Sequence, residues 1–410
     1  MRAGRLELPR PLGQQILSRA TFALNCPDAI QKRPRGDRKT GIITQPFVAW
    51  TFETVSGQVH DRSKWVRVKN KPRAGPYEDI SMRFNIITPV LNGEKFINET
   101  ILSVVSQTGP FSIRYHVQDG VSTDSTIKLL TAWQNRLAND FPINCAGIKF
   151  SFSSEPDRGL YDAVNRGFAA CGDSDLMAWI NADDRYEPGA FVTVAEIFDK
   201  HSDIDWVTGR PTVINETGGM LHISPIVPFP RTAIAAGIFE GRFARPFIQQ
   251  EGTFWRPGLW EKTGGLNANF RLAGDFDLWR RFAMQSDLVI VDTILGCFRR
   301  RRDQLTDDIG RYHAEIDSSL SPDEMETRVK ISKSYAKARF EYRVLLRHYE
   351  GPWVCERWPM CVLPFLGTKA FKAEHWRLSL MARFDKEIRQ IKKRLTTAEN
   401  AAVRPKKVQN

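Results

Sequence analysis

Residues 84–93 read Phe-Asn-Ile-Ile-Thr-Pro-Val-Leu-Asn-Gly, and this stretch decides which class of fold the chain can adopt. The run 84–88 is short and largely apolar and stops before a proline, which indicates a buried β-strand. The following residues, 94–107, carry apolar side chains at helical spacing. A buried strand that leads directly into an amphipathic helix is typical of a β-α unit.

The same alternation continues along the chain. Further strands are predicted at 113–118, 148–152, 176–180, 206–208 and 288–294, and further helices at 126–137, 160–170 and 191–198. Repeated β-α units predict an α/β fold with a mostly parallel sheet that helices cover on both faces. Ligands of such sheets bind beyond the carboxyl ends of the strands.

Polar residues stand at these strand ends. The first strand is followed by Asn92, the second by the run Asp-Gly-Val-Ser-Thr-Asp-Ser-Thr at 119–126, and the fourth by Asn-Ala-Asp-Asp at 181–184. Taken singly, 119–126 also fits a turn with a helix cap, and 181–184 also fits an Asx turn. Three polar ends on one edge of a sheet favour a binding site.

The pair Asp183 and Asp184 indicates the kind of site. Two adjacent carboxylates after a buried strand repel each other unless a cation or a proton intervenes. Magnesium prefers oxygen ligands and is typically held by one or two carboxylates together with substrate phosphates. A divalent metal, Mn²⁺ or Mg²⁺, bound with a diphosphate is therefore expected here. Neither a Walker motif nor GxGxxG follows the first strand, which argues against an NTPase or a dehydrogenase.

The ordered set of motifs at 86–92, 119–126, 181–184 and 274–279 resembles family 2 glycosyltransferases, and the resemblance covers about residues 83–305. It implies the GT-A nucleotide-sugar-binding fold. The stretches 155–167 and 249–256 resemble members that assemble bacterial polysaccharides.

The resemblance implies roles for the residues that bind the donor. Asp119 matches the carboxylate that contacts the nucleotide base, and Thr88 and Asn92 match nucleotide contacts of the first strand. Asp183 matches the metal ligand of the DxD motif, in which Asn181 replaces the first Asp here. Asp184 is then expected to assist.

The resemblance also implies a general base, Asp275. The Glu that precedes this Asp in the family is replaced by Gly274, so Asp277 remains an alternative. A single base without a covalent nucleophile predicts inversion at the anomeric carbon, whereas a hydrolase needs a paired acid and base. Asp275 and Asp277 also fit the acidic start of an ordinary helix.

Four consecutive arginines at 299–302 follow the predicted strand at 288–294. They fit a solvated basic loop, and they equally fit a lid whose guanidinium groups bind the leaving diphosphate. Arg301 is the residue expected to make that contact.

The predicted function is therefore transfer of a sugar from a nucleotide-diphosphate donor to a saccharide or lipid-linked saccharide acceptor, in cell-surface polysaccharide assembly. A nucleotidyltransferase that makes activated sugars is the alternative, but residues 89–95 lack its Gly-rich, Arg-containing loop. A nucleic-acid-binding protein is the third class. No nucleic acid is expected as a partner, because the central part of the chain is acidic.

Charge divides the 410 residues, whose net charge is +12, into three parts. Residues 1–82 carry a net charge of +8, residues 83–328 carry −8, and residues 329–410 carry +12. The predicted domains are a basic, partly disordered N-terminal extension at 1–82, the GT-A domain at 83–310, and a helical basic region at 311–410. Met82 is an alternative start of the protein.

The C-terminal region is predicted to contain a polar helix at 323–349 and a basic amphipathic helix over about 381–395. The second helix fits packing on the enzyme, a short coiled coil, or binding to an anionic membrane surface. No apolar run predicts a membrane span or a secretory signal, and the six cysteines are scattered. A cytoplasmic protein is expected, with peripheral attachment to the inner face of the cell membrane as the role of the tail.

Overall fold

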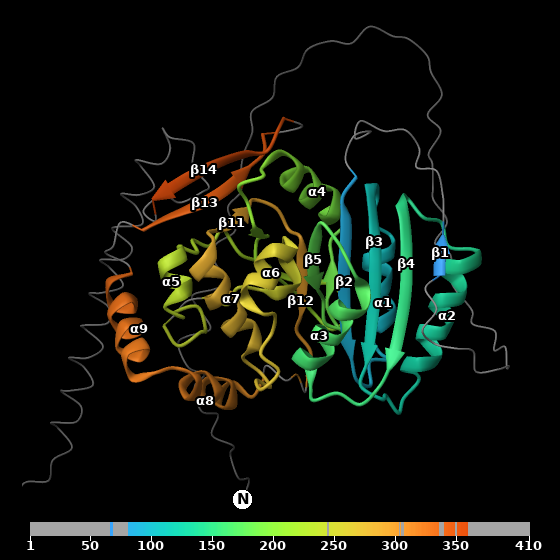
Figure 1. The fold of residues 1–410 in the computed structure, drawn as a ribbon, viewed down its shortest axis with the longest axis horizontal. Coiled ribbons are helices and arrows are strands. Elements are labelled where there is room, and N and C mark those ends of the chain that lie inside the picture. Colours follow the sequence, from blue (N-terminus) through green and yellow to red (C-terminus); the bar gives the residue numbers. More distant parts are fainter. Residues whose placement is uncertain are drawn as a thin grey trace, which may run out of the picture. The chain divides into compact units, whose positions relative to one another are not determined.

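The computed structural model describes residues 66–68, 81–243, 246–302, 304, 307–335, 340–348 and 351–359. Four parallel strands lie side by side in the main sheet, in the order β4-β3-β2-β5 (Figure 1). They are β2 (Arg83–Val90), β3 (Gly109–Asp119), β4 (Cys145–Ser154) and β5 (Leu176–Trp179). The carboxyl ends of the first three are level, because Val90 pairs with Asp119 and Asp119 pairs with Ser154.

Six more strands extend this sheet within the described residues. Next to β5 lie β10 (Thr253–Trp255), β7 (Trp206–Thr208), β11 (Leu288–Val291), β13 (Glu341–Leu346) and β14 (Val354–Pro359), in that order. The pairs β7–β11 and β11–β13 are parallel, whereas β10 and β14 run antiparallel to their neighbours. At the opposite edge, β1 (Val66–Val68) pairs antiparallel with β4.

Helices connect and cover the strands, as the sequence predicts. They are α1 (Ile97–Val105), α2 (Thr126–Asn139), α3 (Leu160–Cys171), α4 (Ala190–Lys200), α5 (Arg231–Ala235), α6 (Pro257–Thr263), α7 (Gly274–Gln285), α8 (Ile309–Ser319) and α9 (Pro322–Ser334). Every residue of β2 after Arg83 is buried, so both faces of the sheet are covered there. The predicted α/β class with a mostly parallel sheet is confirmed.

A second, smaller sheet has four strands among the residues that the structure describes. Its strands are β6 (Arg185–Tyr186), β12 (Gly296–Arg299), β8 (Thr212–Ile214) and β9 (Met220–Ile223), in the order β6-β12-β8-β9. It joins the segment that follows β5 to the arginine run, because Cys297 pairs with Arg185. Residues 181–184 and 299–302 are thereby brought together.

Stacked tryptophans fix α7 on the main sheet. The ring of Trp279 lies 5.5 Å from that of Trp179 at an interplanar angle of 13°, and 5.7 Å from that of Trp206 at 25°. Such pairs stabilise by about 0.5–1.5 kcal/mol beyond the burial of their area. Asp275 lies four residues, about one helical turn, before Trp279. The aromatic core therefore determines where the start of α7 lies.

The predicted helix at 323–349 is wrong beyond Ser334, and the region from 311 onward is not wholly helical. Its residues 341–346 form β13, with Tyr342 and Val344 buried. Pairing with β11 gives the backbone groups their hydrogen-bond partners and buries the alternating apolar side chains. These two contributions outweigh any local preference for helix. The predicted amphipathic helix at 381–395 lies outside the described residues, as do residues 1–65 and 69–80 of the N-terminal extension.

Candidate active site

Asp119 ends β3 at the level edge of the sheet and is fully buried. Its Oδ2 accepts hydrogen bonds from the backbone N–H of Ser122 (3.0 Å) and from the hydroxyl of Ser154 (2.6 Å). Its Oδ1 is buried and has no hydrogen-bond partner. A buried oxygen without a partner is costly, so this atom is available to accept a bond from a ligand.

Asn92 joins the loops that follow β2 and β3. Its N–H donates to the hydroxyl of Ser122 (2.7 Å), and its Oδ1 accepts from the N–H of Thr123 (2.9 Å). Asn92 and Val121 have φ angles of 53° and 67°, which are unfavourable for residues with a Cβ, above all for a β-branched one. Strained backbone that its surroundings hold in place is frequent at binding sites.

Thr88 lies within β2, fully buried, and its hydroxyl shares a hydrogen bond of 3.0 Å with that of Tyr115. The structure therefore does not bring Thr88 to the edge where Asn92 and Asp119 meet. Its expected contact with a nucleotide remains a prediction.

Asp183 follows β5, and its side chain is 19% exposed. Arg301 donates from Nε to its Oδ2 at 2.6 Å, and Arg299 donates from Nε to its backbone oxygen, also at 2.6 Å. Two residues of the predicted site, Asp183 and Arg301, are thus in direct contact. Arg299 is fully buried and pairs with Glu99 as well, so it organises the site from within.

Asp184 is almost completely buried, and its Oδ1 accepts from the N–H of Arg299 at 2.8 Å. Burial, with the nearby charges of Asp183 and Glu251, raises the pKa of Asp184 well above its usual range. A carboxyl group in this environment is held in the protein interior, which suits support of Asp183 better than contact with a substrate.

The donor atoms near Asp183 fit a divalent metal only in part. The described residues hold no group of three His, Cys, Asp or Glu side chains arranged as metal ligands. A hard cation that shares its shell with a diphosphate and water needs no more than one or two protein carboxylates. Asp183 supplies one such carboxylate at a partly open position, so the residues present fit a metal that binds together with its substrate.

Asp275 lies half-buried in the first turn of α7. Burial raises its pKa to about 6, whereas hydrogen bonds from the N–H of Phe276 and from the hydroxyl of Tyr161 lower it. Gly274 explains the missing Glu of the motif: a Cβ there would lie 2.6 Å from the ring of Tyr161. The close approach of that ring requires glycine.

Asp277 has a different environment. Its Oδ2 pairs with Arg281 at 2.7 Å, one turn further along the same helix. An i,i+4 pair of this kind stabilises a helix. The contacts therefore give Asp277 a structural role, and Asp275 stays the predicted general base.

Glu251, in the short helix η2 (Gln250–Gly252), has no role predicted from the sequence, although it lies within the stretch 249–256 that resembles polysaccharide-assembling members. It is 2% exposed, its Oε1 has no hydrogen-bond partner, and burial raises its pKa to about 8. The charges of Asp275 and Asp183 raise this pKa further. Glu251 is therefore near enough to both predicted functional carboxylates for their charges to act on it.

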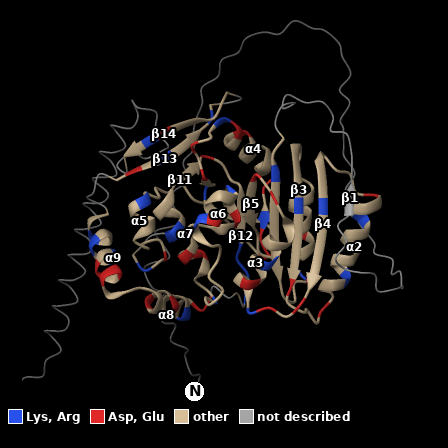
Figure 2. Cartoon of the chain, in the orientation of Figure 1, with Lys and Arg blue, Asp and Glu red and all other residues tan. Residues whose placement is uncertain are grey.

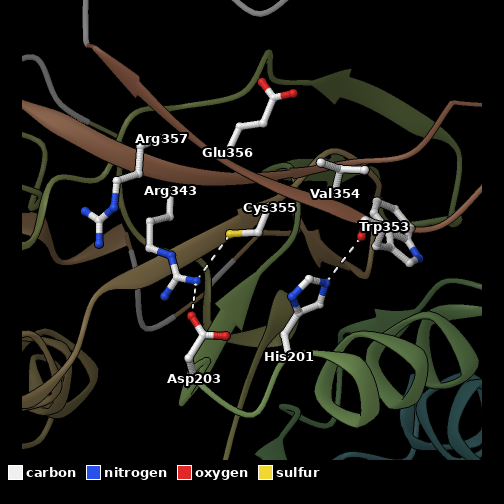
Figure 3. Close-up of a pocket in the computed structure, with 8 residues that line it drawn as sticks. All are labelled: His201, Asp203, Arg343, Trp353, Val354, Cys355, Glu356 and Arg357. Carbon is white, nitrogen blue, oxygen red and sulfur yellow. Dashed lines mark hydrogen bonds and ion pairs between the residues drawn. The ribbon is translucent and has the colours of Figure 1, made fainter.

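Acidic residues gather at the edge where β3 and β4 end (Figure 2). A cavity of about 430 Å³ lies elsewhere, between the loop after α4 and the hairpin β13–β14 (Figure 3). In it, Arg343 pairs with Asp203 at 2.6 Å and contacts the sulfur of Cys355 at 3.3 Å. None of the predicted site residues lines this cavity.

Residues 85–267 match the model of the family described as Glycosyl transferase family 2. The PGL/p-HBAD biosynthesis glycosyltransferase of Mycobacterium bovis is 28% identical over 200 residues, which are 47% of this chain and 67% of that protein. An uncharacterized glycosyltransferase of Mycobacterium tuberculosis is 24% identical over 214 residues, 52% of this chain and 72% of that one. With the parallel sheet, the family match confirms the GT-A class.

Solved structures are similar to the chain at lower sequence identity. Staphylococcus aureus TarS (1–349), in complex with UDP-GlcNAc, gives a TM-score of 0.44 at 15% identity, covering 63% of this chain and 74% of that chain. The mannosyltransferase PcManGT of Pyrobaculum calidifontis, in complex with GDP-Man and Mn²⁺, gives 0.39 at 16% identity, covering 66% and 80%.

Proposed function

We propose that the chain, whose residues 85–267 match the model of glycosyl transferase family 2, transfers a sugar from a nucleotide-diphosphate donor to an acceptor hydroxyl, with inversion. The observation that carries this proposal is Asp275, a half-buried carboxyl group whose pKa is raised to about 6. A general base is most effective when its pKa lies near the working pH.

The nucleotide of the donor binds at the edge formed by β2 and β3. The unpartnered Oδ1 of Asp119 accepts an N–H of the base, which would satisfy this buried atom. Asn92 and the loop 121–123 hold that edge in one conformation through the hydrogen bonds between them. A preformed edge lowers the entropy lost on binding.

The diphosphate binds near Asp183 and Arg301. Asp183 is the residue that would hold a divalent metal, and such a metal neutralises charge that develops on the leaving diphosphate. Arg301 contributes a guanidinium group, which can bind phosphate oxygens in a bidentate manner. Asp184 and Arg299 stay buried and keep Asp183 in place.

Asp275 takes the proton of the acceptor hydroxyl as its oxygen attacks the anomeric carbon. The bond from that carbon to the diphosphate oxygen breaks in the same step, which inverts the configuration. Tyr161, whose own pKa is raised well above its usual value by burial, keeps its proton and orients the carboxylate. Asp277 takes no part because Arg281 holds it.

The acceptor class is a saccharide or a lipid-linked saccharide of a cell-surface polysaccharide. This part of the proposal is supported by the stretches 155–167 and 249–256, and by relatives whose names include PGL/p-HBAD biosynthesis.

The test is a panel of nucleotide sugars that includes UDP-GlcNAc and GDP-mannose, with and without Mn²⁺. Calorimetry measures binding, and release of the nucleoside diphosphate measures turnover with water or added saccharides as acceptors. We expect at least one donor to bind and to be consumed. Failure of every donor to bind, or formation of a nucleotide sugar from a nucleoside triphosphate and a sugar phosphate, would contradict the proposal.

A further inference from the structure

Glu315 of α8 binds the loop that leads into α7. Its Oε1 accepts the backbone N–H of Arg271 at 2.6 Å, and its Oε2 accepts those of Leu272 and Ala273, both at 2.7 Å. The N-cap residue of α7 is Ala273, which has no side-chain oxygen to cap the helix. A carboxylate from a different helix therefore satisfies three N–H groups immediately before Asp275.

We propose that Glu315 is a positioning residue for the general base: it holds the loop 271–274 so that the Asp275 carboxylate faces the acceptor hydroxyl. This inference rests on the proposed function, because it takes Asp275 as the base. It adds to that function a residue outside the segment 85–267, which matches the family model.

The loop is held from its other side by α3. The hydroxyl of Tyr161 donates to the backbone oxygen of Leu272 at 2.7 Å and lies 3.5 Å from Oδ1 of Asp275. Glu315 binds the N–H of Leu272 while Tyr161 binds its carbonyl oxygen. With both of its polar groups bound, this residue cannot rotate without breaking a hydrogen bond, so the position of Asp275 is restricted.

Helix α8 is itself anchored on both sides of Glu315. His313 contacts Oε2 of the fully buried Glu240 at 2.9 Å, and Arg242 binds Asp317 with two hydrogen bonds of 2.6 and 2.7 Å. Arg328 of α9 also pairs with Glu240, at 2.6 Å. Removing one partner of a buried pair is costly, so this network resists displacement of α8. Glu315 is thus carried on a rigid support, as positioning requires.

Electrostatics supplies a signature that a purely structural role would not give. The titratable groups that act on Asp275 or are acted on by it are Tyr161 of α3, Glu251 of η2, and Tyr312 and Glu315 of α8. Burial is the main cause that raises the pKa of Asp275, and the charge of Glu315 raises it by a smaller amount. Neutralising Glu315 should lower this pKa and move the acid limb of turnover to lower pH.

The experiment compares Glu315→Gln and Glu315→Asp with Asp308→Ala. Gln keeps the shape but can offer only one acceptor oxygen, and Asp keeps the charge on a shorter side chain. Asp308 caps α8 by accepting the N–H of Arg311, so its loss weakens the same helix without touching the loop. Readouts are hydrogen exchange of the backbone amides 271–273, donor affinity, and turnover against pH with the donor identified from the panel.

For Glu315→Gln we expect faster hydrogen exchange at the amides 271–273 and an acid limb of turnover at lower pH. Turnover should fall by roughly 10–100-fold, the scale of a misplaced catalytic group. Donor affinity should stay within about twofold of wild type. Glu315→Asp should recover part of the turnover, and Asp308→Ala should keep the wild-type pH profile. Unchanged exchange and turnover in Glu315→Gln would overturn the inference, as would lower turnover with an unmoved acid limb.

The outcome separates this inference from the proposed function. If no donor of the panel binds or is consumed, the proposed function is wrong. If Asp275→Asn retains wild-type turnover, the assignment of the base is wrong, and Glu315 has no base to position. If Asp275→Asn is inactive while Glu315→Gln behaves as wild type, only the role of Glu315 is wrong.

Discussion

Asp183 is the residue that we propose to hold a divalent metal beside the diphosphate. Its carboxylate is paired with Arg301 and only partly exposed. Asp183→Asn should weaken the Mn²⁺-dependent part of donor binding at least tenfold, equivalent to about 1.4 kcal/mol. Calorimetry of donor binding with and without Mn²⁺ measures this change in affinity. Asp140→Asn, at an exposed residue after α2, is the control, and equal Mn²⁺ dependence in both variants would exclude Asp183 as the ligand.

Asp275 and Asp277 differ in their partners although they lie two residues apart. Asp275→Asn should leave donor affinity unchanged and reduce turnover by about 10²–10⁴-fold, the usual range for loss of a general base. Because the base acts unprotonated and its pKa is raised to about 6, wild-type turnover should fall as the pH drops through about 6. Turnover of Asp275→Asn and of Asp277→Asn at saturating donor checks this. Loss of turnover in Asp277→Asn alone would show that Asp277, and not Asp275, is the general base.

Glu251 makes stability depend on pH. Burial raises its pKa from 4.5 to about 8, so the folded protein holds this proton more tightly than the unfolded chain does. Stability is therefore lost as the pH rises from about 4.5 to 8. Glu251→Gln should raise Tm by about 2 °C or more at pH 8, with little change near pH 4.5.

Thermal unfolding at several pH values measures this difference. Glu261→Gln, at an exposed position in α6, is the matched control and should show no such trend. A Glu251→Gln variant no more stable than wild type at pH 8 would contradict the prediction.

At the scale of elements, the start of α7 depends on glycine. A Cβ at Gly274 would lie 2.6 Å from the Tyr161 ring, whereas one at Gly258 of α6 would meet nothing within 4 Å. Gly274→Ala should destabilise by about 1–3 kcal/mol through overpacking. Gly258→Ala should stabilise by about 0.5–1 kcal/mol, because alanine favours helix. Denaturant unfolding compares the two, and equal stability of Gly274→Ala and wild type would show that the ring can move at no cost.

The buried strands and the helices between them could be predicted from the sequence, because apolar runs such as 84–88 leave little choice of structure. The hairpins could not. Strand β9 is exposed at every residue and β14 at most of them, so neither shows the alternation of apolar and polar side chains that marks a half-buried strand. The capping box of Ser321 and Glu324 marks where α9 begins, but the change from helix to strand before β13 depends on pairing with β11.

The same division holds for the site. Asp119, Asp183 and Asp275 could be proposed because they follow strands or open a helix within recognisable motifs. The burial of Thr88 depends on Tyr115 in the neighbouring strand, which no local pattern shows. Glu315 gives no signal in the sequence, because its partners are backbone N–H groups about 40 residues away.

At the scale of the whole molecule, the residues beyond Pro359 carry 12 basic and 4 acidic side chains. No helix in the described part of the chain is long and apolar enough to cross a bilayer. The prediction that the tail binds an anionic membrane surface therefore rests on charge and on the apolar spacing at 381–395. Each basic residue near such a surface contributes about 1 kcal/mol at most.

The structure determines where the tail should be cut. Because β13 and β14 belong to the main sheet, a deletion from Arg328 would remove part of the core, whereas one after Pro359 spares it. The full chain should sediment with anionic liposomes at low salt and be released at high salt, and the variant ending at Pro359 should stay in solution. A full-length protein that does not sediment at low salt would contradict this role of the tail.

The parallel pair β11–β13 has a consequence for synthesis of the protein on the ribosome. Val289 pairs with Arg343, 54 residues later. At 5–20 residues per second, roughly 3–10 s pass between translation of the two. During that interval the apolar strand Leu288–Val291 has an open edge on one side, although its other neighbour, β7, is already made. Chaperones that protect strand edges would be needed most in this interval, and slow codons between 292 and 340 would prolong it.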